Sequence, residues 1–367
     1  MQNILFVCNT YYQLIMAINM RLSLFQDDKV TVLVSDHSKD AGKIVENLKH
    51  LQIFDKTEYI KTKYIDYRNE NKVDNLYDYL KLILRGNNDI KNLIFDRKYK
   101  KFFYFNQNLS SNLIFNILTQ SNKYIEACQF EEGILSYPNI EGNNLRYLKF
   151  GRTKLWCILR KICSKPILIE RTKKVFCLYP DLYFGKLLVE KIPAIKNNSE
   201  LTNILKKVFN VDINEQSYQE KYIYFSSICD FEGGQPIGEL ELIKNIAQIV
   251  GKDNLLIKVH PRDVRDIYKK EGLKIAQVSS VPWEVIQLLY NFNDKIFLTA
   301  TSSSVLMGAA ITGKDTKAFY LYKICNIKDN YIAKSTVASL EMYFNKFKSK
   351  NIFSNIIIAK NIEEILK

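Results

Sequence analysis

The segment Ile4-Leu5-Phe6-Val7-Cys8-Asn9-Thr10-Tyr11-Tyr12-Gln13-Leu14 decides the fold class of this chain of 367 residues. Its apolar start is typical of a buried strand, and a polar turn and a helical pattern as far as Leu22 follow. A second strand pattern at residues 30–34 precedes a helix pattern at residues 40–51. Alternating strands and helices predict an α/β fold with a parallel sheet, whose site lies at the strands' carboxyl ends.

The same alternation starts again in the second half of the chain. Strand patterns at residues 222–225, 255–259 and 295–298 alternate with helix patterns at 239–250, 282–290 and from residue 305. Residues 101–105 and 124–130 read as later strands of the first sheet. The chain is too long for one ordinary core. We therefore predict two Rossmann-like domains, residues 1–180 and 221–367, which face a central cleft and are joined by residues 181–220.

Composition excludes several classes of protein. The seven cysteines show neither CxxC spacing nor pairing with histidine, so we expect no disulfide framework and no zinc site. The N-terminus lacks the pattern of a signal peptide, and no apolar run reaches the roughly 18 to 20 residues of a spanning helix. We expect a cytoplasmic protein that is soluble or peripheral to a membrane.

The formal net charge of +14 indicates an anionic partner. Residues 146–174 contain ten basic residues and one acid, Glu170, interleaved with apolar side chains. This pattern is typical of an amphipathic element that lies on anionic lipid, with Trp156 at the interface, although a solvated domain surface fits equally well. Nucleic acid is disfavoured as a partner because neither an aromatic-rich RNA motif nor a recognition helix is present.

One of the three histidines, His260, is a candidate for chemistry. It ends the strand pattern 255–259 and precedes Pro261, whereas His37 falls in a polar turn and His50 in a lysine-rich helix end. An imidazole with an ordinary pKa of about 6.5 can donate a proton or a hydrogen bond to a departing phosphate. The alternative is a histidine that only caps a turn.

A run of hydroxyl residues stands just before the helix pattern that starts at residue 305, namely Thr301, Ser302, Ser303 and Ser304. Such hydroxyls can cap the free N–H groups of a helix, and the same N–H groups can bind phosphate. One serine would suffice for capping, so the run favours an anion site.

Three carboxylates are candidates for a general base. Glu131 and Glu132 follow the strand pattern 124–130 and precede Gly133, and Asp230 stands in an acidic loop after the strand pattern 222–225. A base has to come within about 3 Å of the acceptor hydroxyl. The alternative is that these acids are only solvated loop residues.

These motifs together resemble those of bacterial sialyltransferases and polysialyltransferases. Glu131-Glu132-Gly133, Lys258-Val259-His260-Pro261 and Ser303-Ser304 follow the order of the acidic-acidic-Gly, His-Pro and Ser-Ser motifs. Residues 6–14 are most similar to glycosyltransferase family 52, which includes lipooligosaccharide and capsular α-2,3-sialyltransferases. The resemblance covers residues 4–310 and implies a GT-B fold. It also implies an inverting, metal-independent reaction in which CMP leaves the anomeric carbon of sialic acid.

The resemblance also assigns roles to single residues. His260 would protonate or stabilise the leaving phosphate, and Ser303 and Ser304 would bind it. The donor site would further contain Lys258, Pro261, Thr301 and Ser302, and the N-terminal loop at the acceptor side would contain Asn9, Thr10 and Gln13. We expect Glu131 to be the base because it lies nearest its strand. Glu132 and Asp230 are the rivals, since the base of family 52 has also been placed in the second domain.

The expected partners are a nucleotide-sugar donor, CMP-sialic acid, and a glycan or glycolipid acceptor ending in galactose, joined in α-2,3 linkage. The anionic inner face of the plasma membrane is a further expected contact, through residues 146–174. Because family 52 also contains glucosyltransferases, a UDP-hexose donor is the alternative. The only adjacent aspartate pair, Asp27-Asp28, precedes a strand, so no metal and no other cofactor is expected. A homodimer is left open.

Overall fold

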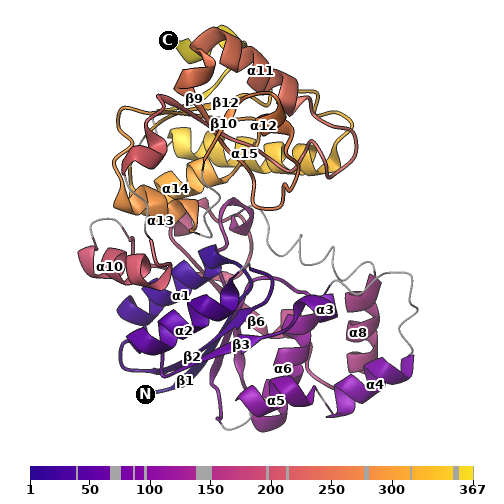
Figure 1. Ribbon diagram of the computed structural model, residues 1–367. Helices are drawn as coiled ribbons and strands as arrows, with labels where there is room; N and C mark the ends of the chain where they lie inside the picture. Colours follow the sequence, from indigo (N-terminus) through magenta and orange to yellow (C-terminus); the bar gives the residue numbers. More distant parts are fainter. Residues whose placement is uncertain are drawn as a thin grey trace. The chain divides into compact units, whose positions relative to one another are not determined.

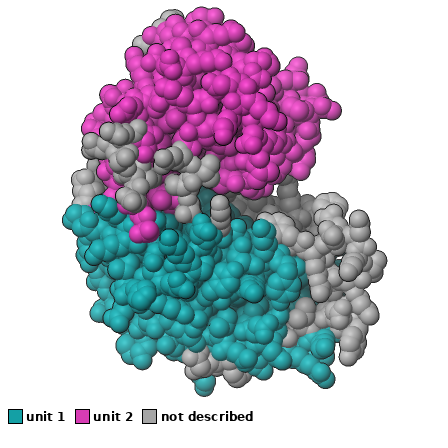
Figure 2. Space-filling model, in the orientation of Figure 1, with its two compact units in different colours: residues 1–195, 199–209 teal, residues 196–198, 210–367 magenta. Residues whose placement is uncertain are grey.

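A computed structural model gives the structure of the protein as two compact units, residues 1–195 with 199–209 and residues 196–198 with 210–367 (Figures 1 and 2). The structure describes the chain outside residues 39, 67–75, 86, 95–96, 138–150, 196–197, 212–214, 277–280, 315, 350–354 and 367.

The first unit contains a parallel sheet with the order β3-β2-β1-β4-β5-β6-β7. Its strands are β1 (Asn3–Cys8), β2 (Lys29–Ser35), β3 (Lys56–Ile60), β4 (Lys101–Tyr104), β5 (Glu126–Phe130), β6 (Thr172–Cys177) and β7 (Leu188–Lys191). Because β1 pairs with both β2 and β4, its apolar side chains are buried on both faces of the sheet. Stacking of Phe6 on Phe103, with ring centroids 4.5 Å apart, joins β1 to β4 on one of these faces.

Helices cover both faces of this sheet (Figure 1). They are α1 (Tyr11–Ser23), α2 (Ala41–Leu51), α3 (Lys63–Asp66), α4 (Leu76–Arg85), α5 (Asn88–Ile94), α6 (Leu109–Ser121), α8 (Gly151–Ile162), α9 (Leu168–Arg171) and α10 (Ser199–Val208), with short 3₁₀ helices η1 (Ile134–Ser136) and η2 (Pro180–Leu182). Helix α6 is buried along most of its length, and it packs with α8 on the side of the sheet that carries Leu5 and Val7.

The second unit contains another parallel sheet, with the order β10-β9-β8-β11-β12-β13. Its strands are β8 (Tyr222–Phe225), β9 (Leu255–Lys258), β10 (Lys274–Ile275), β11 (Ile296–Thr299), β12 (Lys317–Tyr320) and β13 (Ile356–Ile358). Its helices are α11 (Glu239–Val250), α12 (Ile267–Lys270), α13 (Trp283–Leu289), α14 (Ser304–Thr312) and α15 (Tyr331–Ser349), with 3₁₀ helices η3 (Glu215–Tyr218), η4 (Lys252–Asn254) and η5 (Ile362–Leu366).

Helices α13 and α14 pack closely at Gly308. A Cβ atom added at Gly308 would clash with Oε1 of Gln287 and lie 3.2 Å from Cδ1 of Trp283. Glycine is therefore required here by a close approach between helices, and not by an unusual backbone angle. This packing fixes the position of α14 and hence of its first turn.

Much of the segment expected to connect the domains is part of the first unit. Strand β7 pairs with β6 after residue 180, and α10 returns to the first unit. There Asn47 Nδ2 donates to the Val208 carbonyl at 2.8 Å, and Tyr11 packs on Phe209 with ring centroids 5.2 Å apart. The first unit therefore extends to Ile195 and includes residues 199–209.

The basic helix α8 is embedded in the first unit. Trp156 is 1% exposed and lies in the core, so the prediction that it sits at a lipid interface is wrong. The side of α8 that carries Trp156 packs against α4 and α6. Arg160 is also buried, and its Nε donates to the Pro166 carbonyl at 3.0 Å. Ile158 and Ile162, on the opposite stripe, are 45% and 72% exposed.

Two further predictions concern the start of the basic segment and the absence of a membrane-spanning helix. Residues 146–150 of the basic segment lie outside them. Among the helices that are described, none is both long enough and apolar enough to span a membrane.

Candidate active site

The predicted donor residues lie at and beyond the ends of β9 and β11, the two strands that flank β8 in the second unit. Strand β8 stands between β9 and β11, and Phe225 at its end is opposite both Lys258 and Thr299. With strands about 4.8 Å apart, the ends of β9 and β11 are about 10 Å from each other. The loops that begin there carry His260 on one side and the serine run on the other.

The His260 imidazole is held by backbone contacts. The His260 N–H donates to Ser226 Oγ at 2.9 Å, and His260 Nδ1 accepts from the Arg262 N–H at 3.2 Å. Burial lowers the pKa of His260 to about 4, helped by the charges of Arg262 and Lys258 and opposed by Asp263. The ring is therefore neutral at pH 7. Since Nδ1 accepts, Nε2 carries the proton and can donate a hydrogen bond.

The serine run opens the buried, apolar helix α14. Ser303 is the N-cap but makes no side-chain cap, and among the described residues the hydroxyls of Ser302 and Ser304 also have no hydrogen-bond partner. The turn is held from within instead, because the Ser302 N–H donates to Thr299 Oγ1 at 2.8 Å. Thr301 is 3% exposed and contacts Cys229 Sγ at 3.6 Å. Three serines at a helix N-terminus thus stay available to an anion.

The loop between β8 and α11 links the two sides of this site and is held by Glu239, the first residue of α11, which the sequence analysis does not single out. Glu239 is fully buried and accepts from the Ser227 N–H, the Ser227 hydroxyl and the Tyr224 hydroxyl, at 2.9 to 3.1 Å. Burial raises the pKa of Glu239 to about 7. The sequence pattern that could have pointed to Glu239 is an acid at the start of a helix, shortly after the two serines that follow β8.

Asp230 belongs to the same loop. Its two carboxylate oxygens accept from the N–H groups of Glu239 and Leu240, each at 3.1 Å. These are the first N–H groups of α11, so Asp230 caps this helix. Both oxygens are engaged in a structural role.

Lys258 is packed within the second unit near residues that the sequence reasoning also missed. Its Nζ lies 5.9 Å from the centre of the Trp283 ring. Burial lowers the pKa of Lys258, and the carboxylate of Glu284 opposes this shift. Pro261, in contrast, is exposed and marks the end of the strand. Lys258, the last residue of β9, thus places an amino group two residues before His260.

The N-terminal loop of the first unit is a helix cap. Thr10 Oγ1 accepts from the Gln13 N–H at 3.3 Å, and Gln13 Oε1 accepts from the Thr10 N–H at 3.4 Å and also from the Asn9 N–H at 2.6 Å. This reciprocal pair is a capping box at the start of α1. All three residues therefore have a structural function in the described unit.

The two glutamates after β5 have different environments. Glu131 is fully buried and accepts from the Tyr12 hydroxyl at 2.5 Å, the Leu178 N–H at 2.7 Å and the Tyr137 hydroxyl. Burial raises the pKa of Glu131, and these hydrogen bonds oppose the rise. Both oxygens of the Glu131 carboxylate accept hydrogen bonds that join β5 to α1 and to the loop after β6.

Glu132 is partly exposed and faces the side chains of Thr10 and Gln13. Burial raises the pKa of Glu132 to about 7, and the nearby polar side chains of Thr10 and Gln13 limit the rise. Its N–H donates to Ser136 Oγ at 2.7 Å, and the next residue, Gly133, has a φ of 95° that favours glycine. The turn thus presents Glu132 at the carboxyl edge of the sheet.

Within the described residues, no group of three or more His, Cys, Asp and Glu side chains is placed to hold a metal ion. Asp27 and Asp28 lie in the turn before β2. The first unit thus offers a carboxylate at its strand ends and the second unit an anion site at its own.

Two parallel-sheet α/β units of this kind have the GT-B fold, as predicted. The chain belongs to the alpha-2,8-polysialyltransferase (POLYST) family, whose sequence model matches residues 4–323. It is therefore a member of a sialyltransferase family, an enzyme with a nucleotide-sugar donor and a glycan acceptor. The predictions of the fold class and of a glycosyltransferase are confirmed.

Solved structures are similar to this chain over nearly its whole length. A UDP-N-acetylglucosamine 2-epimerase aligns with a TM-score of 0.50 and 12% identity, over 100% of this chain and 90% of that chain, which shows the fold. An alpha/beta-galactoside alpha-2,3-sialyltransferase from Photobacterium phosphoreum aligns with a TM-score of 0.49 and 14% identity, over 99% of this chain and 98% of that chain. No curated protein sequence matches the chain.

The geometry around His260 generates a direct prediction. We expect the imidazole to titrate near pH 4, so that its NMR signals stay in the neutral form from pH 8 to pH 5. The His260→Gln variant identifies the signal. The Arg262→Gln variant, which removes one of the cations, should raise the pKa of His260. A His260 signal that titrates near its ordinary pKa of about 6.5 would contradict the buried, cationic environment described above.

Proposed function

We propose that this enzyme transfers sialic acid from CMP-sialic acid to a hydroxyl group of a bacterial surface glycan, without a metal ion. The observation that carries the proposal is the anion site of the second unit. There the Nε2–H of a neutral His260 and the unbonded serine hydroxyls at the start of α14 stand on the loops after β9 and β11, the two strands that flank β8.

The hydrogen-bond donors of this anion site suit the phosphate of CMP. When CMP leaves, the bond between the anomeric carbon and the phosphate oxygen breaks, and the electron pair stays on the phosphate. Ser302, Ser303 and Ser304 can donate to that charge, and so can the free N–H groups of α14. His260 adds one further hydrogen bond. A UDP-hexose, with its diphosphate, is the second candidate donor.

We assign the general base to Glu132. The base has to accept a proton from the attacking hydroxyl while that oxygen bonds to the anomeric carbon. A carboxylate with a pKa of about 7 at a partly exposed position suits this step, because it is a stronger base than an ordinary glutamate. Glu131, our expectation from the sequence, and the rival Asp230 both have their oxygens engaged in structural hydrogen bonds.

Two acceptors fit the family. The motif resemblance favours a terminal galactose in α-2,3 linkage, whereas the family name gives an α-2,8 linkage. Lactose and an α-2,8-linked disialyl glycan are the matching test acceptors. We keep galactose as our proposed acceptor and the sialylated glycan as its rival.

We further propose that α8 attaches the enzyme to an anionic membrane at the inner face of the plasma membrane. Ile158 and Ile162 are exposed one helical turn apart, beside the exposed lysines 154 and 161. Helix α4, which packs against α8, exposes Leu84 to 65%. Apolar side chains next to lysines are the combination that anionic lipid surfaces bind.

The donor proposal predicts that the purified protein releases CMP from CMP-sialic acid and leaves UDP-hexoses intact. The reaction should continue in excess EDTA, since His260 and the serine run supply the donors to the phosphate. Release of CMP and transfer to the two acceptors can be followed by chromatography. Consumption of a UDP-hexose instead, or activity that only magnesium or manganese restores, would overturn the proposal.

The Glu132 assignment predicts that Glu132→Gln lowers the rate of transfer by about 100-fold or more, the scale of general-base loss, while CMP still binds. In the native enzyme the rate should fall as the pH drops below about 7, because protonation of Glu132 removes the base. The Glu132→Gln variant should lack this dependence. Glu131→Gln tests the rival: it should lower the stability of the first unit, because an amide cannot accept all the hydrogen bonds of the buried carboxylate, but the folded variant should keep the pH dependence. Loss of transfer only in Asp230→Asn would place the base in the second unit.

The membrane proposal predicts binding to phosphatidylglycerol vesicles and not to phosphatidylcholine vesicles. Lys154→Gln with Lys161→Gln should weaken binding by about 1 kcal/mol per charge, and Ile158→Ser with Ile162→Ser should weaken it further. The exposed pair Lys269 and Lys270 of the second unit, changed to Gln, is the control. Sedimentation at two salt concentrations measures the effect. Native protein that ignores anionic vesicles at low salt contradicts the attachment.

A further inference from the structure

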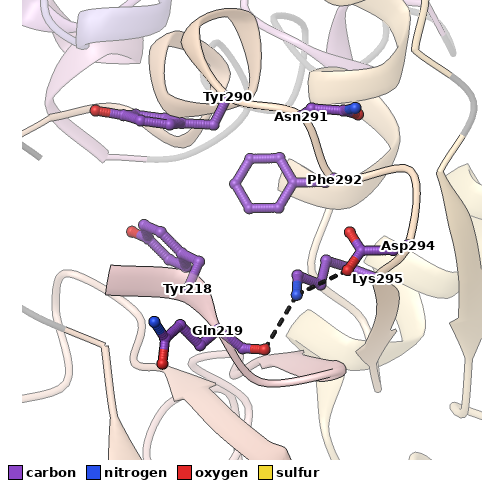
Figure 3. A pocket seen from close by; sticks show the side chains of 7 residues that line it. All are labelled: Tyr218, Gln219, Tyr290, Asn291, Phe292, Asp294 and Lys295. Atoms are coloured by element: carbon purple, nitrogen blue, oxygen red, sulfur yellow. Dashed lines mark hydrogen bonds and ion pairs between the residues drawn. The ribbon is translucent and has the colours of Figure 1, made fainter. Parts of the chain in front are cut away.

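The second unit contains a pocket at the edge of the sheet opposite to the anion site (Figure 3). It has a volume of about 380 Å³ and is lined by Tyr218, Gln219, Tyr290, Asn291, Phe292, Asp294 and Lys295. These residues precede β8 and β11, whereas the anion site lies beyond the opposite ends of β9 and β11. Four residues of strand, about 13 Å, separate the two places.

The aromatic wall of this pocket is fixed by its surroundings. Tyr218 is 8% exposed and packs edge-on against Trp283 and Phe292, with ring centroids 5.7 and 5.6 Å away. Burial raises the pKa of Tyr218 to about 12, and the nearby Tyr290 adds to the rise. Tyr218 therefore keeps its hydroxyl proton at neutral pH. In Figure 3 the Tyr290 side chain lies above that of Tyr218, with Phe292 beside them.

The backbone around the pocket is held by two lysines. Lys314 Nζ donates to the carbonyls of Gln287 and Tyr290, at 2.9 and 2.8 Å, and so fixes the end of α13. Lys295 Nζ donates to the Gln219 carbonyl at 3.0 Å and pairs with Asp294 at 3.0 Å (Figure 3). A pocket whose walls are already ordered binds a ligand without the cost of ordering them.

The polar groups of the pocket offer donors and acceptors with no net charge. Gln219 and Asn291 carry exposed amides, and Asn291 Oδ1 already accepts from the Asn293 N–H at 3.0 Å, which leaves its NH₂ group as a donor. The Asp294 carboxylate accepts, and it neutralises Lys295. A phosphate or another strong anion would find no unpaired cation among the seven lining residues.

We propose that this pocket is a second glycan-binding site, which takes one neutral sugar residue. The apolar face of a sugar ring packs on the Tyr290 and Tyr218 rings, and its hydroxyls bond to the amides and to Asp294. Aromatic residues with a few placed polar groups are the usual composition of small-ligand pockets.

The function of such a site would be to hold an acceptor glycan by a sugar distant from its reacting end. Two linked contacts raise the effective concentration of a long acceptor, while a short acceptor gains nothing. The identification of the glycan as the acceptor rests on the proposed function. The binding of a neutral sugar to the pocket does not.

The test is direct binding of neutral lacto-N-tetraose to the full chain, measured by saturation-transfer NMR without any donor. Tyr290→Ala should weaken binding about tenfold. Asn291→Trp, which fills the mouth of the pocket and leaves its core residues in place, should weaken it at least as much. Tyr331→Ala removes a tyrosine that is 73% exposed elsewhere in the second unit and is the matched control.

Three results would overturn the inference: equal binding by both pocket variants and native protein, loss of binding in His260→Ala instead, or binding only of 3′-sialyllactose. Release of CMP from CMP-sialic acid by the pocket variants is measured in parallel. That release should stay at the native rate, so failure of the glycan site and failure of the proposed function give different results.

Discussion

The parallel pairing of β8 with β9 on one side and β11 on the other is the constraint on which the candidate site of the second unit depends. It sets Lys258 and Thr299 opposite Phe225, and the loops that follow can then share contacts with the loop after β8. That loop bonds His260 through Ser226 and touches Thr301 through Cys229. The two halves of the anion site are therefore part of one hydrogen-bonded framework.

Buried carboxylates hold the loops at the edges of both sheets. Glu131 in the first unit and Glu239 in the second each accept three or more hydrogen bonds from neighbouring loops, away from water. Removing one such acid would leave several buried donors unsatisfied, which costs more than the hydrogen bonds contribute. Such anchored acids leave their less buried neighbours, such as Glu132, able to change protonation state.

The sequence predicts most strands and helices well, because both sheets are buried on two faces and their strands are short apolar runs between polar turns. The fold class and the family motifs follow from this pattern. The sequence does not show that Trp156 is covered by other helices, since an amphipathic stripe does not identify its partner. It also does not distinguish Glu131 from Glu132, because adjacent residues differ only in which tertiary contacts they meet. The pocket at Tyr218 and Tyr290 is formed by segments about 70 residues apart in the sequence, so no local sequence pattern predicts it.

The close contact at Gly308 links a residue outside the candidate site to the serine run. A side chain at this position would have to displace the buried Gln287 side chain or shift α14, and a shift of α14 would move its first turn. The serines at that turn would then present their hydroxyls in a different place, although none of them had changed. The position of these hydroxyls therefore depends on a residue that lies outside the candidate site and meets only its helix neighbours.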